Sequence, residues 1–525
     1  LTIKPNYDEA YNNMGNALKG VTFTKPDRDL QSTIFSLLDR ERYVRPNEIA
    51  KAAISLLKLE PTLGKHLQSI DTDIEESPLD VISYISELPL LLKLMSVCPL
   101  PDLELEKLLT NLRRYILLNI SSVEEASVEL LGLQSALALQ CFTNEYIYSY
   151  SDEEEEILKL LEASVKKHLE NNDQPSPHVV LTLASYKALN CYEWYQLLAV
   201  TDSIQEVFTR QVKEPQKENE LKSHFSIVKE ITNSISSEVR AQYEESPYPR
   251  WVNLAVDPMP ISIVNMVNQI KLKFRSDKFT EVKRPDILIA GCGTGQHSIG
   301  TATRFKDAKV LAIDLSLSSL AYAKRKTEEL GIENLEYLQT DILDLCQLNK
   351  QFDLIQSTGV LHHMDNPMVG WKVLTECLKP GGIMKIGLYS ELARQDIVKV
   401  RQEISNAGIG SGDAEMRSFR DTIIKSYKNY YEQIKNSSDF YSLSTLRDLL
   451  FHVQEHRFTI PQIKACLAEL GLEFCGFEEP SIVSHFRQTS KDKDDLYDLD
   501  KWQAYEEVNP RAFAGMYQFW CQKVD

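Results

Sequence analysis

A short apolar run that leads into a cluster of glycines constrains this chain more than any other feature. Residues 286–290 read Asp-Ile-Leu-Ile-Ala, and residues 291–295 read Gly-Cys-Gly-Thr-Gly. The run predicts a strand, and the glycines predict a turn that opens a helix. Because the glycines lack side chains, a ligand can approach the backbone N–H groups at the start of that helix.

The sequence after Arg284 continues to alternate short β-rich runs with helical stretches. This alternation predicts a parallel sheet wound with helices. Further strands are expected at residues 310–313, 335–339, 352–356 and 383–389.

Two acidic residues follow strands of this predicted sheet. Asp314 ends the second strand, 19 residues after Gly295, where a carboxylate accepts hydrogen bonds from both hydroxyls of a ribose. Asp341 and Ile342 follow the third strand, where a carboxylate can meet an adenine amino group. The glycine turn and Asp314 also suit an NAD-binding fold, so a dinucleotide remains an alternative at this point.

From Asp286 onward the sequence resembles the class I methyltransferases that use S-adenosylmethionine (SAM). The resemblance rests on the strand and glycine turn, Asp314, and three later stretches, which are Thr340-Asp341-Ile342, residues 352–363 and Leu378-Lys379-Pro380-Gly381-Gly382. Dinucleotide enzymes do not carry the last of these. The resemblance implies a Rossmann-like, seven-stranded α/β domain, with a sixth strand at 472–477 and an antiparallel seventh at 516–522.

The resemblance also implies a set of residues that bind SAM. They are Gly291, Cys292, Gly293, Thr294, Gly295, Asp314, Leu315, Asp341, Ile342, Ser357 and Val360. Tyr243, Tyr248 and Arg250 precede the first strand, in a segment that folds over the cofactor in many relatives. An arginine suits the carboxylate of SAM. A structural linker held by buried aromatic rings is the alternative for this segment.

Five polar residues are candidates for the chemistry or for acceptor binding. His362 and His363 follow the fourth strand, where a base could take a proton from a hydroxyl or an amine, or where the pair could shape the cofactor site. His452, Glu455 and His456 form an HxxEH pattern, which is also a zinc signature. Helical periodicity places His452 and His456 one turn apart at the border of an apolar face, which suits a metal site and a pocket wall equally. Only 69 residues remain for a third ligand and the last two strands need them, so acceptor recognition is favoured over zinc, with surface or helix-packing roles as the alternative.

The N-terminal half is expected to be helical. Residues 5–18 resemble the first helix of a tetratricopeptide (TPR) repeat, with Pro5 closing a preceding repeat. Such repeats need neighbours, and the chain begins at Leu1 without a leader sequence, so we expect a fragment of a longer protein. Helix starts are predicted at the pairs Ser122–Glu125 and Ser151–Glu154, and a linker is predicted at 213–219.

These observations divide the chain into three expected regions. Residues 1–20 end a truncated TPR array, residues 21–220 form an all-α domain, and residues 221–525 form the methyltransferase domain. A helical insertion at 391–457 is expected to cover the strand ends, as part of a lid over the acceptor.

Composition excludes several classes of protein. Of 525 residues, 43% are hydrophobic, and the net charge is −18, which disfavours a nucleic-acid partner. The nine cysteines form no CxxC pair, and no stretch has the length and hydrophobicity of a membrane span, so a cytoplasmic protein is expected.

We expect a small metabolite, a glycan or a protein as methyl acceptor. The helices would recruit that protein or form a homo-oligomer, and a non-catalytic SAM-binding module is the alternative.

Overall fold

The computed structural model describes residues 8–69, 77–123, 125–257, 259–490 and 492–524. The chain forms two compact units. A helical unit comprises residues 1–217, 250–256 and 409–449, and a sheet unit comprises residues 218–249, 257–408 and 450–525. Among the described residues, no helix combines the length and the apolar character that a membrane span requires.

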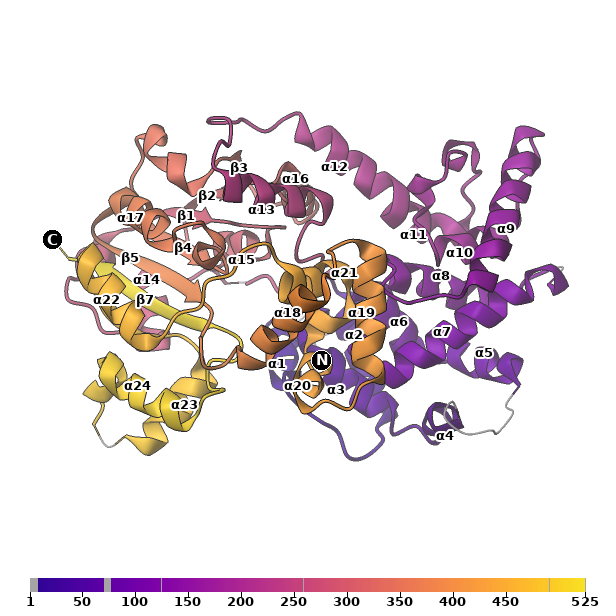
Figure 1. The fold of residues 1–525 in the computed structure, drawn as a ribbon, viewed down its shortest axis with the longest axis horizontal. Helices are drawn as coiled ribbons and strands as arrows, with labels where there is room; N and C mark the ends of the chain where they lie inside the picture. Colours follow the sequence, from indigo (N-terminus) through magenta and orange to yellow (C-terminus); the bar gives the residue numbers. More distant parts are fainter. Residues whose placement is uncertain (1–7, 70–76, 124, 258, 491, 525) are drawn as a thin grey trace. The chain divides into compact units, whose positions relative to one another are not determined.

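The helical unit contains only helices as regular elements in its described part (Figure 1). They are α1 (Asp8–Leu18), α2 (Arg28–Asp39), α3 (Pro46–Leu57), α4 (Pro61–Ser69), α5 (Pro78–Ser86), α6 (Pro89–Val97), α7 (Leu103–Leu118), α8 (Val128–Thr143), α9 (Asp152–Glu170), α10 (Pro177–Ala184), α11 (Gln205–Phe208), α19 (Asp413–Lys425), α20 (Asn429–Lys435) and α21 (Leu443–Leu446). The predicted all-helical character is confirmed. The TPR assignment of α1 stays a prediction, and Pro5 lies outside the described residues.

Part of the expected insertion belongs to this helical unit. Arg420 of α19 donates two hydrogen bonds to the carboxylate of Glu106 in α7, both 2.6 Å long, and both residues are buried. Arg420 also donates to the carbonyl of Phe440. A buried pair of this kind stabilises a fold only while both partners are present. Residues 409–449 therefore pack with helices that precede them by some 300 positions in the sequence.

Local predictions in this unit have mixed outcomes. Ser151 and Glu154 form the predicted capping box of α9. The predicted start at Ser122 is wrong, because Ser127 caps the next helix through the N–H of Leu130. The predicted linker at 213–219 contains a boundary between the two units, after Lys217, but its residues are helical, since α12 (Glu214–Lys222) follows directly on a π-helical turn (Thr209–Lys213).

The sheet unit holds a seven-stranded sheet, which confirms the predicted fold class. Its order is β3-β2-β1-β4-β5-β7-β6, and only β7 runs antiparallel to its neighbours. The strands are β1 (Asp286–Ala290), β2 (Lys309–Asp314), β3 (Leu335–Gln339), β4 (Phe352–Thr358), β5 (Leu378–Leu388), β6 (Leu472–Phe477) and β7 (Tyr517–Lys523). The expected turn before the fifth strand lies inside β5, where the pairing with β4 shifts register.

Nine α-helices lie wholly within the described part of this unit. They are α13 (Ser234–Glu245), α14 (Ile263–Ile270), α15 (Gln296–Arg304), α16 (Leu317–Glu329), α17 (Pro367–Cys377), α18 (Gln395–Ala407), α22 (Ile460–Leu470), α23 (Pro480–Thr489) and α24 (Leu499–Val508). Helices α13 and α16 lie side by side (Figure 1). The capping box predicted at Thr459 and Gln462 is confirmed at the start of α22.

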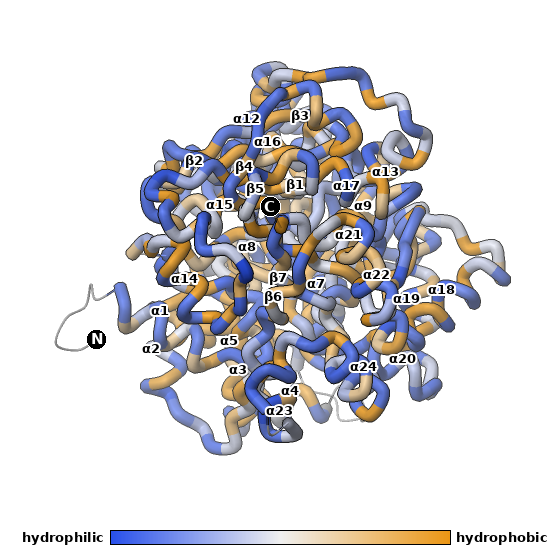
Figure 2. Tube along the Cα trace, turned by 90° about the vertical axis from the view of Figure 1, so that its left-hand side faces the viewer, coloured by the Kyte–Doolittle hydropathy of each residue, from blue (hydrophilic) through white to orange (hydrophobic). Residues whose placement is uncertain are grey.

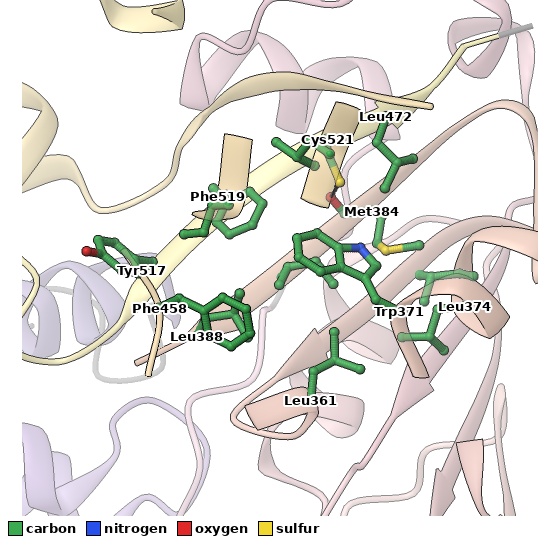
Figure 3. Close-up of a cluster of buried hydrophobic side chains, with 14 of the residues drawn as sticks. Leu361, Trp371, Leu374, Met384, Leu388, Phe458, Leu472, Tyr517, Phe519 and Cys521 are labelled. Atoms are coloured by element: carbon green, nitrogen blue, oxygen red, sulfur yellow. Dashed lines mark hydrogen bonds between the residues drawn. The ribbon is translucent and has the colours of Figure 1, made fainter. Parts of the chain in front are cut away.

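Apolar residues of β4, β5, β7 and α17 contribute to a large buried core of this unit. Trp371 is fully buried among the side chains of this cluster, and Phe458 lies beside Leu388 at the end of β5 (Figure 3). Hydrophilic and hydrophobic residues alternate along the helices, as amphipathic elements with one buried face require (Figure 2). The core fixes the carboxyl ends of the strands, where the candidate site lies.

Candidate functional site

The glycine turn adopts backbone geometry that other residues resist. Gly291, Gly293 and Gly295 all have positive φ, at 77°, 51° and 91°. A Cβ on Gly293 would lie 2.8 Å from the carbonyl oxygen of Tyr248, and one on Gly291 would overlap the side chain of Val360. The turn therefore needs glycine for both conformation and space.

The two predicted acids sit at the ends of β2 and β3. Asp314 accepts hydrogen bonds from the N–H of Gly293 (2.8 Å) and of Ser316 (3.0 Å). Burial raises the pKa of Asp314, while these backbone N–H groups oppose the rise. Asp341 is buried and accepts from the N–H of Leu343, which caps the helical turn after β3. The structure thus brings Asp314 onto the glycine turn itself.

The segment before the first strand lies against the same turn. The hydroxyl of Thr294 donates to the carbonyl of Pro249, and the carbonyl of Tyr248 lies over Gly293. The rings of Tyr243 and Tyr248 stack at 6.4 Å. We call residues 243–249 the strap. That the strap folds over the cofactor stays a prediction.

Glu244 anchors the strap at its other end. Its carboxylate accepts hydrogen bonds from the N–H groups of Leu317 (2.6 Å) and Ser318 (3.0 Å), at the start of α16. An acidic group at a helix N-terminus satisfies free N–H groups and complements the helix dipole. Sequence analysis missed Glu244, because its partners lie 73 and 74 residues away and no motif links them.

Other predicted cofactor residues occupy varied positions. Ser357 is buried near the end of β4, and its hydroxyl has no hydrogen-bond partner among the described residues. The carbonyl of Leu315 accepts from Gln339 at 2.8 Å. Arg250 belongs to the helical unit, where its Nε lies 3.2 Å from a carboxylate oxygen of Glu145. Tyr243 and Tyr248 thus lie in the same unit as the glycine turn, and a role of Arg250 at the cofactor stays a prediction.

The HxxEH segment is not helical, so the helical placement of its side chains is wrong. A π-helical turn ends at Phe451, and residues 452–459 form no helix before the start of α22. The N–H of His456 donates to the carbonyl of His362 (2.7 Å), and the N–H of Phe458 donates to that of Tyr389 (2.9 Å). These long-range bonds replace the i to i−4 bonds of a helix. Residues 452–458, the crossing segment, thus lie along the ends of β4 and β5.

The three polar side chains of this segment have different partners. Glu455 is buried and forms ion pairs with Arg394 (2.7 Å) and Arg401 (2.8 Å). Burial alone would raise the pKa of Glu455, but these arginines hold it below its usual range. The imidazole Nε2 of His456 lies 3.2 Å from the carbonyl of Asp365. The pattern does not act as one ligand set on a helix face.

His452 and His363 stack, with ring centroids 3.7 Å apart. The N–H of Gln454 donates to Nδ1 of His452, so Nε2 carries the proton and donates to the hydroxyl of Tyr243 (3.1 Å). Nδ1 of His363 lies 2.6 Å from the carbonyl of Gln454 and must donate to it. In neutral His363, Nε2 is therefore the basic nitrogen.

His362 is fully buried between His363 and Tyr389, with ring centroids at 4.3 Å and 4.1 Å. Neither of its ring nitrogens has a hydrogen-bond partner among the described residues. Burial, with the charges of His363 and Arg394, holds its pKa well below the usual range. Burial and the neighbouring His363 and Arg401 likewise lower the pKa of His452 to about 2. Both rings are neutral at physiological pH.

Residues 287–382 match the family model described as "Methyltransferase domain". The chain contains a methyltransferase domain. An uncharacterized protein of Synechococcus sp. is 28% identical over 54% of this chain and 70% of its own length. The ubiquinone biosynthesis O-methyltransferase of Rickettsia canadensis is 27% identical over 32% of this chain and 70% of its own length.

The solved structure of PKMT2 from Rickettsia typhi matches 49% of this chain with a TM-score of 0.37 and 16% identity. The match spans about half of that protein, 51% of its chain. SAM is the methyl donor of this class of methyltransferase domain. The site fits it, because the glycine turn has no Cβ atoms beside its backbone N–H groups, where they would collide with Val360 and Tyr248, and Asp314 and Asp341 present acceptor oxygens at the ends of β2 and β3.

Proposed function

We propose that the protein transfers the methyl group of SAM to an acceptor bound beside His363, at the carboxyl ends of β4 and β5. One observation carries this proposal. A chain of contacts within the sheet unit connects the glycine turn to His363. Thr294 of the turn is hydrogen-bonded to Pro249 of the strap, and the strap residues Tyr248 and Tyr243 stack on one another. Tyr243 is hydrogen-bonded to His452, which stacks on His363. The cofactor residues thus adjoin a potential base.

The residues in this arrangement divide the work. Bound SAM supplies a methyl group on a positively charged sulfur, which is already a good leaving group. Gly291 to Gly295, Asp314 and Asp341 would orient it, with Tyr243 and Tyr248 excluding water. His363 would take the acceptor proton on Nε2, because the carbonyl of Gln454 fixes its tautomer. His362, a buried and neutral ring, would shape the site by packing against His363.

The acceptor is a small molecule, a glycan or a protein. In the last case the helices of the N-terminal region would present it, as TPR-like helices present extended surfaces to protein partners. Of the insertion predicted at 391–457, residues 391–408 and 450–457 belong to the sheet unit and would complete the acceptor site. His452, Glu455 and His456 would contribute to acceptor recognition from this second piece.

The test is methyl transfer from labelled SAM into a fractionated extract. We expect His363→Asn to slow transfer by about 10²–10⁴-fold, because the amide keeps a donor toward Gln454 but cannot act as a base. SAM affinity should be unchanged, and His168→Ala, an exposed histidine of α9, serves as the control. Full activity of His363→Asn would show that His363 is not the catalytic base. SAM binding without any transfer would show a non-catalytic SAM-binding module.

A further inference from the structure

Glu506 of α24 is a carboxyl group buried beside the ends of β5 and β7, and it is only 1% exposed. The hydroxyl of Tyr517 donates to both of its oxygens, at 2.6 and 2.7 Å, and the hydroxyl of Ser390 donates to one of them at 2.7 Å. Ser390 also accepts from the N–H of Ala393, so its own proton is left for Glu506. Two hydroxyl groups from different segments thus meet on one carboxylate.

This carboxylate has neutral partners. Among the described residues, no lysine, arginine or histidine forms an ion pair with Glu506. Burial raises the pKa of Glu506, and the hydrogen bonds from Tyr517 and Ser390 oppose the rise. A buried charge costs free energy, which an apolar side chain at the same position would not. Positions where a chain departs from low-cost packing are expected to serve function, so we looked for what Glu506 holds.

Ser390 lies in the short stretch that leaves β5. It directly follows Tyr389, whose carbonyl accepts from the N–H of Phe458 at 2.9 Å. The N–H of Glu391 donates to the carbonyl of Phe458 at 2.8 Å. The crossing segment therefore binds the backbone on either side of Ser390, and Glu506 holds the side chain between these two bonds.

The ring of Tyr389 packs against both imidazoles at the end of β4. Its centroid lies 4.1 Å from that of His362 and 6.2 Å from that of His363, with the ring of His363 edge-on. The two imidazoles are 4.3 Å apart. A displacement of Tyr389 would therefore displace the ring proposed as the base, and a misplacement of about 1 Å can cost roughly 10²-fold in rate.

We propose that Glu506 is a positioning residue for methyl transfer, which acts through Ser390 and Tyr389 on the imidazole of His363. This inference rests on the proposed function, because His363 is the base proposed there. Helix α24 belongs to the segment between β6 and β7, so that segment contributes to the reaction as well as to the core.

Two variants that each remove one hydroxyl from the same carboxylate test this role. With labelled SAM and the active extract fraction, Ser390→Ala should lower kcat about tenfold, because a hydrogen bond on the path to Tyr389 is lost. Tyr517→Phe removes the bond that lies off this path and should leave kcat within about twofold. The Kd for SAM should be unchanged in both variants. Equal kcat values for the two would overturn the positioning role, whereas a wild type that binds SAM without any transfer would overturn the proposed function itself.

Glu506→Gln tests the same role without a change near β5. An amide has one acceptor oxygen in place of two, so a donated bond is weakened or lost, and kcat should fall about threefold or more with the Kd for SAM unchanged. Glu507→Gln, at the exposed neighbour that accepts from Gln503, is the control and should have no effect. Wild-type kcat in Glu506→Gln, or a rise in the Kd for SAM that matches the fall in kcat, would contradict a positioning role.

Discussion

Asp314 binds backbone N–H groups 2 and 21 residues away, whereas Glu455 binds the guanidinium of Arg394, 61 residues away. We call the ends of β1 to β3, with Asp314, the proposed cofactor side, and the ends of β4 and β5, with Glu455, the proposed acceptor side. On the acceptor side the crossing segment is held by long-range bonds, such as that from His363 to Gln454 across 91 residues. The glycine turn and Asp314 are held by nearer residues, although the strap that lies against them also comes from a distant part of the sequence.

The largest difference between the two sides should appear on removing the charge of Glu455. Glu455→Gln leaves Arg394 and Arg401 without their shared carboxylate, and breaking a buried pair in this way costs roughly 3–5 kcal/mol of unfolding free energy. Chemical denaturation measures this loss. Glu473→Gln, at an exposed pair with Arg275, should cost less than about 0.5 kcal/mol. A loss for Glu455→Gln no larger than that of the control would show that the crossing segment is held by other contacts.

The difference in unfolding free energy between the wild type and Glu455→Gln should also depend on pH. The pKa of Glu455 is lowered in the folded protein, so its ionised form stabilises the fold. The advantage of the wild type over Glu455→Gln should be complete above the ordinary glutamate pKa. It should shrink as the pH falls through the lowered pKa of the folded state. Denaturation midpoints at several pH values test this, and an advantage that grows on acidification would contradict the assignment.

On the cofactor side, Asp314→Ala should weaken SAM binding by about 1–3 kcal/mol, because the ribose hydroxyls lose a charged acceptor. Calorimetry measures this change, with exposed Glu336→Ala of β3 as the control. Because burial raises the pKa of Asp314, wild-type affinity should also begin to fall at a higher pH than an ordinary aspartate would cause. An unchanged affinity in Asp314→Ala would break the distinction between the two sides.

The smallest effect is expected for His456→Ala. Its imidazole contacts Gln454 and a backbone carbonyl at the rim of the acceptor side, so SAM affinity should stay within about 0.5 kcal/mol. The rate of methyl transfer should fall, because His456 is expected to contribute to acceptor binding. Parallel binding and turnover measurements separate the two outcomes, and a loss of SAM affinity equal to that of Asp314→Ala would place His456 on the cofactor side.

The difference between the two sides also explains what sequence analysis could predict. The strands, the glycine turn and Asp314 follow from short patterns, and the structure confirms the strands to within a few residues. The helix predicted through His452 is absent because backbone bonds to His362 and Tyr389 determine that segment. Arg394 and Arg401 look like ordinary helix residues, and only the folded chain brings Glu455 to them. Short sequence patterns predict contacts between residues that are close in the sequence, and few of the contacts that hold Glu455 and His363 are of that kind.

The division of the chain into interleaved segments has a consequence for its synthesis. The chain passes between the two units at residues 217, 249, 256, 408 and 449. Domains usually fold one after another as they leave the ribosome. Here Glu106 emerges more than 300 residues before Arg420, so the helical unit must wait, with one face uncovered, until most of the sheet has been translated. A nascent chain with this order needs protection from aggregation for most of its elongation. Truncation at any crossing point up to residue 408 would leave both units incomplete, whereas truncation at residue 449 would leave only the sheet unit incomplete.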